Sequence, residues 1–217
     1  MINWNAIESV FLDMDGTLLD LHFDNHFWRE FVPQRYAQQH DLDLDAAKAT
    51  LFPRFSAVEG TLDWYCVDYW SNELGLDIPS LKQELHHLIS VHPHVVDFLD
   101  AVRRRGKRLV LVTNAHQKSL RLKMERTQLA GHFNAIICTH EFGIPKEHAD
   151  FWSRLQKREP FDRQFTLLVD DSVPVLKAAR DYGISHLLAV RRPDTQSPPR
   201  EVSEFAAIDS FLDILPE

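Results

Sequence analysis

FLDMDGTLLD, residues 11–20, places two carboxylates and a glycine directly after a short apolar run. Because residues i and i+2 of a strand point the same way, Asp13 and Asp15 leave the strand on one side and Met14 on the other. Gly16 then permits a sharp turn. Two carboxylates this close repel each other, so they need a cation between them or a proton on one of them. The pattern suits phosphoryl chemistry, although a chance DxD followed by an Asp-Gly turn has the same letters.

The composition is that of a globular chain with an excess of negative charge. The 217 residues are 44% hydrophobic and 26% charged, and the formal net charge is -8 with a pI ≈ 5.8. This charge argues against a nucleic-acid polymer or an anionic membrane surface as partner. A small phosphorylated substrate remains compatible with it, because a bound cation can reverse the sign of the charge locally. The oligomeric state does not follow from the sequence.

Cysteine usage and the first residues of the chain indicate the cytoplasm. Cys66 and Cys138 have no CxxC neighbour, so zinc and redox motifs are absent, and both are expected to be buried thiols in a reducing compartment. The opening MINWNAIE has no basic region followed by an apolar core, and no run approaches the roughly 20 apolar residues of a membrane span. We therefore expect a cytoplasmic protein.

Short apolar runs alternate with helix-forming segments over most of the chain. Runs with little polar alternation are typical of parallel strands that are covered on both faces. The predicted strands are 7–12, 108–113, 135–139, 166–170 and 186–190, and the predicted helices are 93–105, 116–129, 147–157 and 173–182. Glycines at positions 106, 131 and 183 are expected to end three of these helices. The alternation predicts an α/β fold with a Rossmann-like, doubly wound parallel sheet.

Residues 21–90 interrupt this alternation. They are rich in helix formers and aromatic residues and contain no convincing strand, so we interpret them as a helical cap inserted after the first strand, a lid over the site. The predicted organisation is a core of residues 1–20 and 91–217 and a helical cap of residues 21–90. The tail 191–203 is expected to be a loop, and a short helix is expected over 206–215.

Chemically informative side chains follow the predicted strands. They are Asp13 and Asp15 after the first strand, Thr113 and Asn114 at the end of the second, Lys146 in the loop after the third, and Asp170 and Asp171 at the end of the fourth. Because the carboxyl ends of parallel strands converge on one crevice, these groups are expected to lie together, where they can hold Mg²⁺ and orient a phosphate. Taken singly, each has a simpler reading: a helix cap for Thr113 and Asn114 or for the Asp170-Asp171 pair, and a solvated loop residue for Lys146.

The ordered motifs resemble those of the haloacid dehalogenase superfamily of phosphohydrolases. DMDGT is similar to its first motif, VTN to its second, PK to its third and VDDS to its fourth, over residues 1–20 and 91–190. The resemblance implies that Asp13 is the nucleophile, forming an aspartyl-phosphate, and that Asp15 is the general acid and then the general base. It also implies that Thr113, Asn114 and Lys146 bind the phosphoryl group. Mg²⁺ is then held by Asp13, Asp170, Asp171 and the backbone carbonyl of Asp15.

Two features refine this resemblance. Dehalogenases of the superfamily that act on carbon–halogen bonds lack an aspartate at the position of Asp15, so its presence favours phosphate chemistry. Lys146 is followed by Glu147, where many relatives carry proline, which changes the loop and leaves the ammonium in place.

Two further stretches, DGTLLDLHFDNHFW and HEFGIPKE, are similar to the bacterial GMP/IMP nucleotidases of this superfamily. This similarity implies a Mg²⁺-dependent phosphomonoesterase that hydrolyses purine nucleoside 5′-monophosphates to nucleoside and phosphate. A phosphosugar phosphatase or phosphomutase of the same superfamily is the alternative. A non-catalytic binding module is a third reading, which the complete set of motif residues disfavours.

The predicted cap offers aromatic side chains for base recognition. Trp64, Tyr65, Tyr69 and Trp70 partly share a helix face and could stack on a purine, although most of these rings are expected to form the core of the cap. Between the first motif and the cap stand Asp20, His22, Asp24, Asn25 and His26, some of which are candidates to face the substrate. The histidines show no HExxH and no zinc-binding spacing.

Overall fold

The predicted apolar runs form a parallel sheet in the structure, a computed structural model that describes residues 2–216. The strands are β1 (Ser9–Leu12), β2 (Arg108–Thr113), β3 (Ala135–Cys138), β4 (Thr166–Asp170), β5 (His186–Val190) and β6 (Ala207–Ile208). Their order is β3-β2-β1-β4-β5-β6, and every neighbouring pair is parallel. The carboxyl end of β1 therefore lies between those of β2 and β4. The Rossmann-like, doubly wound sheet is confirmed.

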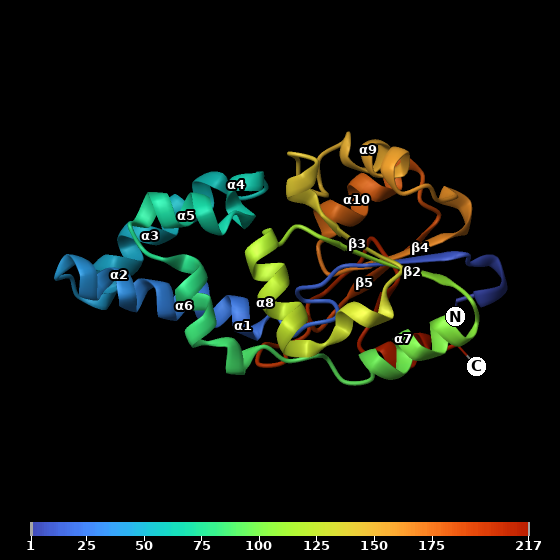
Figure 1. The fold of residues 1–217 in the computed structure, drawn as a ribbon, viewed down its shortest axis with the longest axis horizontal. Coiled ribbons are helices and arrows are strands. Elements are labelled where there is room, and N and C mark those ends of the chain that lie inside the picture. Colours follow the sequence, from blue (N-terminus) through green and yellow to red (C-terminus); the bar gives the residue numbers. More distant parts are fainter. Residues whose placement is uncertain (1, 217) are drawn as a thin grey trace.

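Each face of the sheet is covered by its own helices. Val10 and Leu12 lie in one hydrophobic cluster with residues of α7 (Val95–Arg104) and α8 (Gln117–Thr127). Phe11, between them, packs on the other face with α9 (Phe151–Arg158) and α10 (Val173–Tyr182). Figure 1 shows α9 and α10 above the sheet and α7 below it. Both faces of β1 are buried, which is why its sequence is a continuous apolar run.

A helical region of residues 22–88 lies beside the sheet, at the left of Figure 1. Its elements are α1 (His22–His26), the π-helical turn η2 (Phe27–Phe31), α2 (Val32–His40), α3 (Leu44–Val58), α4 (Leu62–Tyr65), α5 (Val67–Leu74), α6 (Ile78–Glu84) and the 3₁₀ turn η3 (His86–Leu88). Phe27, Leu51, Trp70 and Ile78 belong to a hydrophobic cluster within this region. The region therefore has apolar packing of its own, in addition to the two clusters on the sheet.

The carboxyl-terminal segment differs from the prediction of a helix over 206–215. Instead, β6 pairs with β5, and a 3₁₀ turn, η7 (Phe211–Ile214), follows. Ile208, Phe211 and Ile214 are buried, and their spacing of three residues is also compatible with the buried face of a helix. A strand residue followed by a tight turn buries the same positions as a helix would.

Three helices have boundaries other than those predicted. α7 spans Val95–Arg104 rather than 93–105. α8 ends at Thr127, because Gln128 takes a left-handed backbone conformation with φ 59°, so Gly131 does not end the helix. α9 begins at Phe151 rather than at 147, because the backbone N–H of His148 donates to the carbonyl of Pro145 in a turn before the helix. The remaining 3₁₀ turns are η1 (Trp4–Ala6), η4 (Leu129–His132), η5 (Thr139–Glu141) and η6 (Arg163–Phe165).

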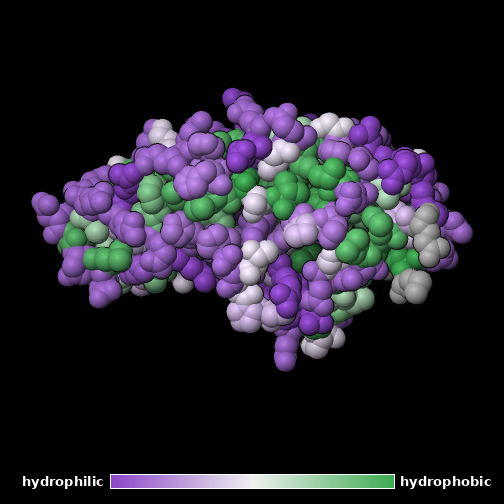
Figure 2. Space-filling model, turned by 90° about the horizontal axis from the view of Figure 1, so that it is seen from below, coloured by the Kyte–Doolittle hydropathy of each residue, from purple (hydrophilic) through white to green (hydrophobic). Residues whose placement is uncertain are grey.

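The surface is largely hydrophilic. In Figure 2 the visible face is mostly purple, with hydrophobic residues in separate groups. Large apolar side chains that stay exposed include Leu42 and Phe52 in the helical region and Val96 and Leu212 elsewhere, so they come from different elements. Within residues 2–216, none of the helices combines the length and the apolar character that crossing a bilayer requires.

Candidate active site

The turn after β1 brings the two aspartates of the first motif to the sheet edge. The backbone N–H of Asp13 donates to the carbonyl of Val169 at 3.1 Å, which continues the β1–β4 ladder, and Met14 is buried. Gly16 has φ +83°, a conformation that L side chains rarely adopt. A Cβ at this position would lie 2.7 Å from Oδ2 of Asp171. The glycine therefore allows both the turn and the close approach of the fourth motif.

A buried lysine joins the ends of β1 and β4. Lys146 Nζ donates to Asp13 Oδ1 at 2.5 Å and to Asp170 Oδ2 at 2.6 Å, and its side chain is only 2% exposed. Burial opposes the charge, but Asp13 and Asp170 hold the pKa of Lys146 above its usual value. The alternative of a solvated loop lysine is thus wrong.

The amide of Asn114 fixes the loop that carries this lysine. Its Oδ1 accepts from the backbone N–H of Lys146 at 2.9 Å, and its Nδ2 donates to Glu147 Oε2 at 2.9 Å. Thr113, which ends β2, accepts from the backbone N–H of Ala115 through Oγ1 at 3.0 Å. A hydroxyl that accepts in this way still has a proton to donate. Thr113 can donate to a ligand, whereas the amide of Asn114 already has two protein partners.

Three carboxylates form a group that fits a hard cation. One oxygen each of Asp13, Asp170 and Asp171 lies within 4.8 Å of the others. Burial and the neighbouring carboxylates raise the pKa of Asp171 well above its usual value, and burial, against the pull of Lys146, raises that of Asp13 to about 6. Arg200 Nη1 lies 3.2 Å from Asp171 and, like Lys146, offsets part of the charge. Crowded carboxylate oxygens of this kind are the ligands that Mg²⁺ prefers.

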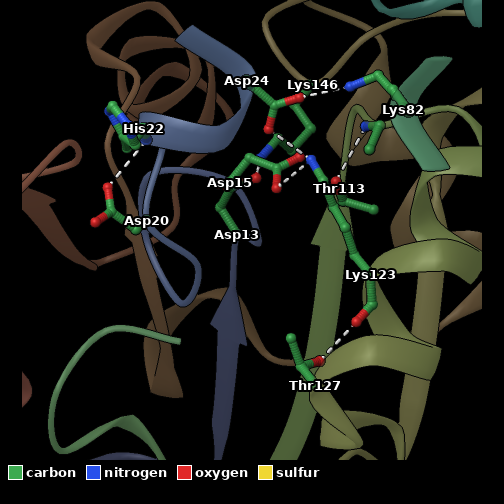
Figure 3. A network of polar contacts seen from close by, with 11 residues as sticks. Asp13, Asp15, Asp20, His22, Asp24, Lys82, Thr113, Lys123, Thr127 and Lys146 are labelled. Atoms are coloured by element: carbon green, nitrogen blue, oxygen red, sulfur yellow. Dashed lines mark hydrogen bonds and ion pairs between the residues drawn. The ribbon is translucent and has the colours of Figure 1, made fainter. Parts of the chain in front are cut away.

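The side chain of Asp15 belongs to a second buried ion cluster. Lys123 of α8 donates to Asp15 Oδ1 at 2.7 Å and to Asp24 Oδ2 at 2.6 Å, and Lys82 of α6 donates to Asp24 Oδ1 at 2.7 Å (Figure 3). The cluster links the sheet edge to the helical region. The carboxylate of Asp15 is therefore placed beside, not within, the group of three carboxylates.

Proton occupancy in this cluster differs between its two aspartates. Burial raises the pKa of Asp15 to about 6, although Lys123 opposes the shift. For Asp24 burial acts in the same direction, but Lys123 and Lys82 together outweigh it and hold the pKa below the usual value. Asp15 can therefore carry a proton near neutral pH, while Asp24 stays ionised.

A cavity of ≈ 990 Å³ opens between the sheet edge and the helical region. All seven motif residues named from the sequence line it: Asp13, Asp15, Thr113, Asn114, Lys146, Asp170 and Asp171. The helical region contributes aromatic walls, which include Trp28, Phe55, Trp64 and Tyr65. The motif residues of the four strand ends therefore converge on one crevice, as predicted.

The polar residues between the first motif and the helical region are divided. Asp24 and Asn25 line the cavity. Asp20 faces away from it and accepts from the backbone N–H of Thr195 at 3.1 Å and from the Thr195 hydroxyl. His22 lies 3.8 Å from Asp194, and its ring stacks with that of His26 at a centroid distance of 6.0 Å. Through Asp194 and Thr195, the loop of residues 191–203 thus contacts Asp20 and His22 and holds the start of the helical region in place.

The aromatic residues of the predicted cap serve mainly in packing. Trp70 is 1% exposed, and its Nε1 donates to the carbonyl of Trp64 at 3.0 Å, while Tyr69 packs on its ring. Tyr65 OH donates to Glu147 Oε1 at 2.9 Å, which ties the helical region to the loop of Lys146.

Four residues near the site were not identified from the sequence: Trp28, Lys82, Lys123 and Arg200. A signal existed for Lys123, because it stands between Leu120 and Met124, which face the core, and so shares the buried side of α8. Trp28 lies on the π-helical turn η2, a feature that often marks functional sites and that sequence periodicity does not reveal.

Comparison with known proteins agrees with the fold and the motifs. The model of the haloacid dehalogenase-like hydrolase family matches residues 7–183. The GMP/IMP nucleotidase YrfG of Escherichia coli (strain K12) is 35% identical over 215 residues, which are 99% of this chain and 97% of that protein. A phosphoglycolate phosphatase of Agrobacterium fabrum is 25% identical, over 94% of this chain and 89% of its own.

Solved structures share the fold at lower identity. A HAD phosphatase from Thermococcus onnurineus has a TM-score of 0.80 at 20% identity, with 96% of both chains covered. The family match and the parallel sheet together define the class of protein, a hydrolase with a Rossmann-like core. The chain belongs to the haloacid dehalogenase-like hydrolase family, as its motifs predicted.

Proposed function

We propose that this protein is a Mg²⁺-dependent phosphomonoesterase that hydrolyses purine nucleoside 5′-monophosphates to nucleoside and phosphate. The observation that carries the proposal is the contact of buried Lys146 with both Asp13 and Asp170 at the floor of a large cavity. The similarity to a GMP/IMP nucleotidase over nearly the whole chain supports this substrate class.

In the first step, a carboxylate oxygen of Asp13 attacks phosphorus and forms an aspartyl-phosphate. The bond between phosphorus and the 5′-oxygen of the nucleoside breaks, and Asp15 gives its proton to that oxygen. The raised pKa of Asp15 supports this role, because it leaves the carboxyl partly protonated near neutral pH. Lys146 offsets the negative charge of Asp13 as the anionic phosphoryl group approaches, and Thr113 donates its hydroxyl proton to a phosphoryl oxygen.

In the second step, water attacks the phosphorus of the aspartyl-phosphate. Asp15, now ionised, accepts the proton of the water, and the bond between phosphorus and the Asp13 oxygen breaks, so that phosphate leaves. The contact of Lys123 with Asp15 at 2.7 Å stabilises the ionised form that this step requires.

Asp13, Asp170 and Asp171, with the backbone carbonyl of Asp15, are the groups that would hold Mg²⁺. When bound, the cation supplies the positive charge that offsets repulsion between the carboxylates and the phosphoryl group. The crowding of three carboxylates, two of them buried, supports this assignment. Among the described residues, Lys146 and Arg200 are the cations recorded beside these three negative charges, which leaves an excess of negative charge for a bound cation to offset.

The helical region is proposed to act as a cap on the core, with the division expected from the sequence: core residues 1–20 and 91–217, cap residues 21–90. Aromatic side chains from this region line the cavity above the carboxylates. A purine base stacks well on such rings, and the cavity volume suits a nucleotide. Trp28 and Trp64 are therefore proposed as the first candidates for base contact.

A phosphatase for small phosphorylated acids or sugars is the second candidate. The observation that favours it is the 25% identity to a phosphoglycolate phosphatase over most of the chain. The two candidates differ in the part of the substrate beyond the phosphate, which is where the aromatic lining of the cavity would matter.

The test is a phosphate-release assay with Mg²⁺ over GMP, IMP, AMP, UMP, phosphoglycolate and sugar phosphates, with Asp13→Asn as the inactive control. We expect kcat/KM to be highest for GMP and IMP. Higher kcat/KM for phosphoglycolate or a sugar phosphate would assign the second function. Isomerisation of a sugar phosphate without phosphate release would indicate a mutase.

A further inference from the structure

Three side chains that can act as metal ligands, Cys66, His116 and His140, meet where the helical region and the core come together. Cys66 lies between α4 and α5, His116 caps the start of α8, and His140 lies in η5 after β3. One ligand atom from each lies within 4.8 Å of the other two. The donors are one sulfur and two imidazoles, in contrast to the all-oxygen group of Asp13, Asp170 and Asp171.

The contacts of the two histidines leave room for a further ligand. His140 Nε2 is buried and has no hydrogen-bond partner among residues 2–216, while its Nδ1 lies 3.8 Å from Cys138 Sγ. The rings of His116 and His140 are nearly perpendicular, with centroids 4.8 Å apart. His116 Nε2 lies 3.8 Å from Asp68 Oδ2, which is too long for a hydrogen bond. A buried imidazole nitrogen without a partner is costly and calls for an explanation.

We propose that Cys66, His116 and His140 form a binding site for Zn²⁺ or a similar borderline divalent cation, distinct from the carboxylate site. Thiolate and imidazole are the ligands that zinc prefers, and three of them with a fourth position for water or a carboxylate make a complete tetrahedral site. Water is the simplest fourth ligand, because Asp68 lies outside the group of three: its Oδ2 is 3.8 Å from His116 Nε2, and its Oδ1 pairs with exposed Lys118 at 2.7 Å.

The surroundings of the ligands support the proposal. Burial and then the neighbouring His116 lower the pKa of His140 to about 4, so its ring is neutral, as a ligand must be. The sulfur of Cys66 accepts from the backbone N–H of Tyr69 at 3.4 Å, a contact that a bound thiolate can keep. His116 Nδ1 accepts from the backbone N–H of Lys118 at 3.3 Å, so binding of the cation through Nε2, which moves the ring proton to Nδ1, gives up only this weak contact.

The site has a structural consequence that the carboxylate group does not share. Cys66 belongs to the helical region, whereas both histidines belong to the core, so a cation bound by all three would join the two parts. Next to it in the chain, Tyr65 already reaches Glu147 in the loop of Lys146. Cation binding at Cys66 would therefore stabilise the arrangement of helical region and core seen in Figure 1.

The test uses Co²⁺ as a spectroscopic probe and Zn²⁺ as the competitor. With one equivalent of Co²⁺, a reducing agent and excess Mg²⁺, the full-length protein should develop a thiolate-to-cobalt charge-transfer band and strong visible bands of tetrahedral cobalt. Equimolar Zn²⁺ should abolish both and should raise the melting temperature. Co²⁺ on carboxylates gives no thiolate band, and Asp170→Asn is expected to leave the band unchanged.

Matched variants decide which side chains are ligands. Cys66→Ser and His140→Ala should lose the thiolate band or weaken Co²⁺ binding by at least about a hundredfold. Cys138→Ala, which removes the other thiol near His140, and His148→Ala, which removes a histidine outside the cluster, should bind as the wild type does. Circular dichroism and the metal-free melting temperature establish that each variant is folded. A wild-type protein without the band, or a Cys66→Ser protein that keeps it, would overturn the proposal.

Discussion

Replacing Lys123 by methionine probes the ion cluster that the structure places beside Asp15. The substitution keeps an unbranched, buried side chain and removes the ammonium that contacts Asp15 at 2.7 Å and Asp24 at 2.6 Å. Lys82 still pairs with Asp24 at 2.7 Å, so Asp15 is the carboxylate that loses its recorded cation. The variant therefore isolates the effect of Lys123 on the proposed general acid.

The expected loss of stability follows from the burial of Lys123, whose side chain is 2% exposed, against its partner Asp15, which is 22% exposed. Removing one partner of a buried ion pair costs about 3–5 kcal/mol, and the lower end applies here because Asp15 can take up a proton. For a chain of this size, about 3 kcal/mol corresponds to a fall in Tm of about 6–12 °C. The control is Lys177→Met, which breaks an exposed ion pair with Glu204 and should leave Tm unchanged within error.

The pH dependence has a definite sign. Lys123 lowers the pKa of Asp15, so its removal should move that pKa above about 6. A carboxyl whose pKa is higher in the folded than in the unfolded protein makes the folded state bind more protons. Stability then falls as pH rises from the unfolded pKa, near 3.8, through the folded pKa. In metal-free buffer, the amount by which Tm of Lys123→Met lies below that of the wild type should therefore become smaller as pH is lowered from 8 to 5.

Thermal unfolding across this pH range, together with the pH profile of kcat, measures both effects. The double variant Lys123→Met with Asp15→Asn should recover part of the lost stability, because it also removes the carboxylate that the first substitution leaves without its cation. A Lys123→Met protein that melts with the wild type at pH 8 and shows the same pH profile would refute the role assigned to this cluster.

The remaining predictions concern the nucleophile, the metal and the aromatic wall. Asp13→Asn should abolish phosphate release. In chelator at pH 8 it should raise Tm, because it removes one of three crowded carboxylates, whose mutual repulsion is present above a folded pKa of about 6 for Asp13. An Asp13→Asn protein that is shown not to have deamidated and still turns over at the wild-type rate would contradict this prediction. Phosphate release should stop in chelator and return with Mg²⁺. Ca²⁺ should inhibit it, because this cation prefers longer bonds and more ligands. Activity in exhaustively metal-free buffer would disprove the metal assignment. Trp28→Ala or Trp64→Ala should raise KM for GMP about tenfold to a hundredfold, from roughly 1–3 kcal/mol of lost stacking, with little change for a small chromogenic phosphate. Trp70→Ala, which opens a hole in the packed helical region, should instead lower Tm and affect both substrates alike, and the opposite pattern would reverse the two roles.

The sheet could be predicted from the sequence because each strand is apolar on both faces. The runs at 108–113, 166–170 and 186–190 coincide with β2, β4 and β5 to the residue. Strands that are buried on both faces are continuous apolar runs without alternating polar residues, so the ends of the run mark the ends of the strand. The end of the chain could not be predicted in the same way. Positions 208, 211 and 214 have helical spacing, and the pairing of β6 with β5 that decides their conformation is a tertiary contact.

The site divides along similar lines. The motif residues could be identified because each lies at the end of a strand or in the loop after it, and parallel strands bring their carboxyl ends together. Lys82 could not, because its partner Asp24 is 58 residues distant and a lysine on a helix is usually solvated. For Lys123 the sequence indicates only the buried side of α8, because its partner Asp15 is 108 residues distant. The Cys66 cluster was missed for the same reason: its ligands come from three separate elements, and Cys66 is half-buried rather than buried as expected.

Trapping the covalent intermediate on Asp13 tests the central claim most directly. The protein is mixed with GMP and Mg²⁺, quenched in acid during turnover and reduced with borohydride, which converts an aspartyl-phosphate to homoserine. Peptide mass spectrometry then locates the change. We predict homoserine at position 13 in the wild type, with none in the absence of substrate and none in Asp13→Asn. Reduction at another residue, or an unmodified Asp13 in protein that is releasing phosphate under the same conditions, would contradict the account.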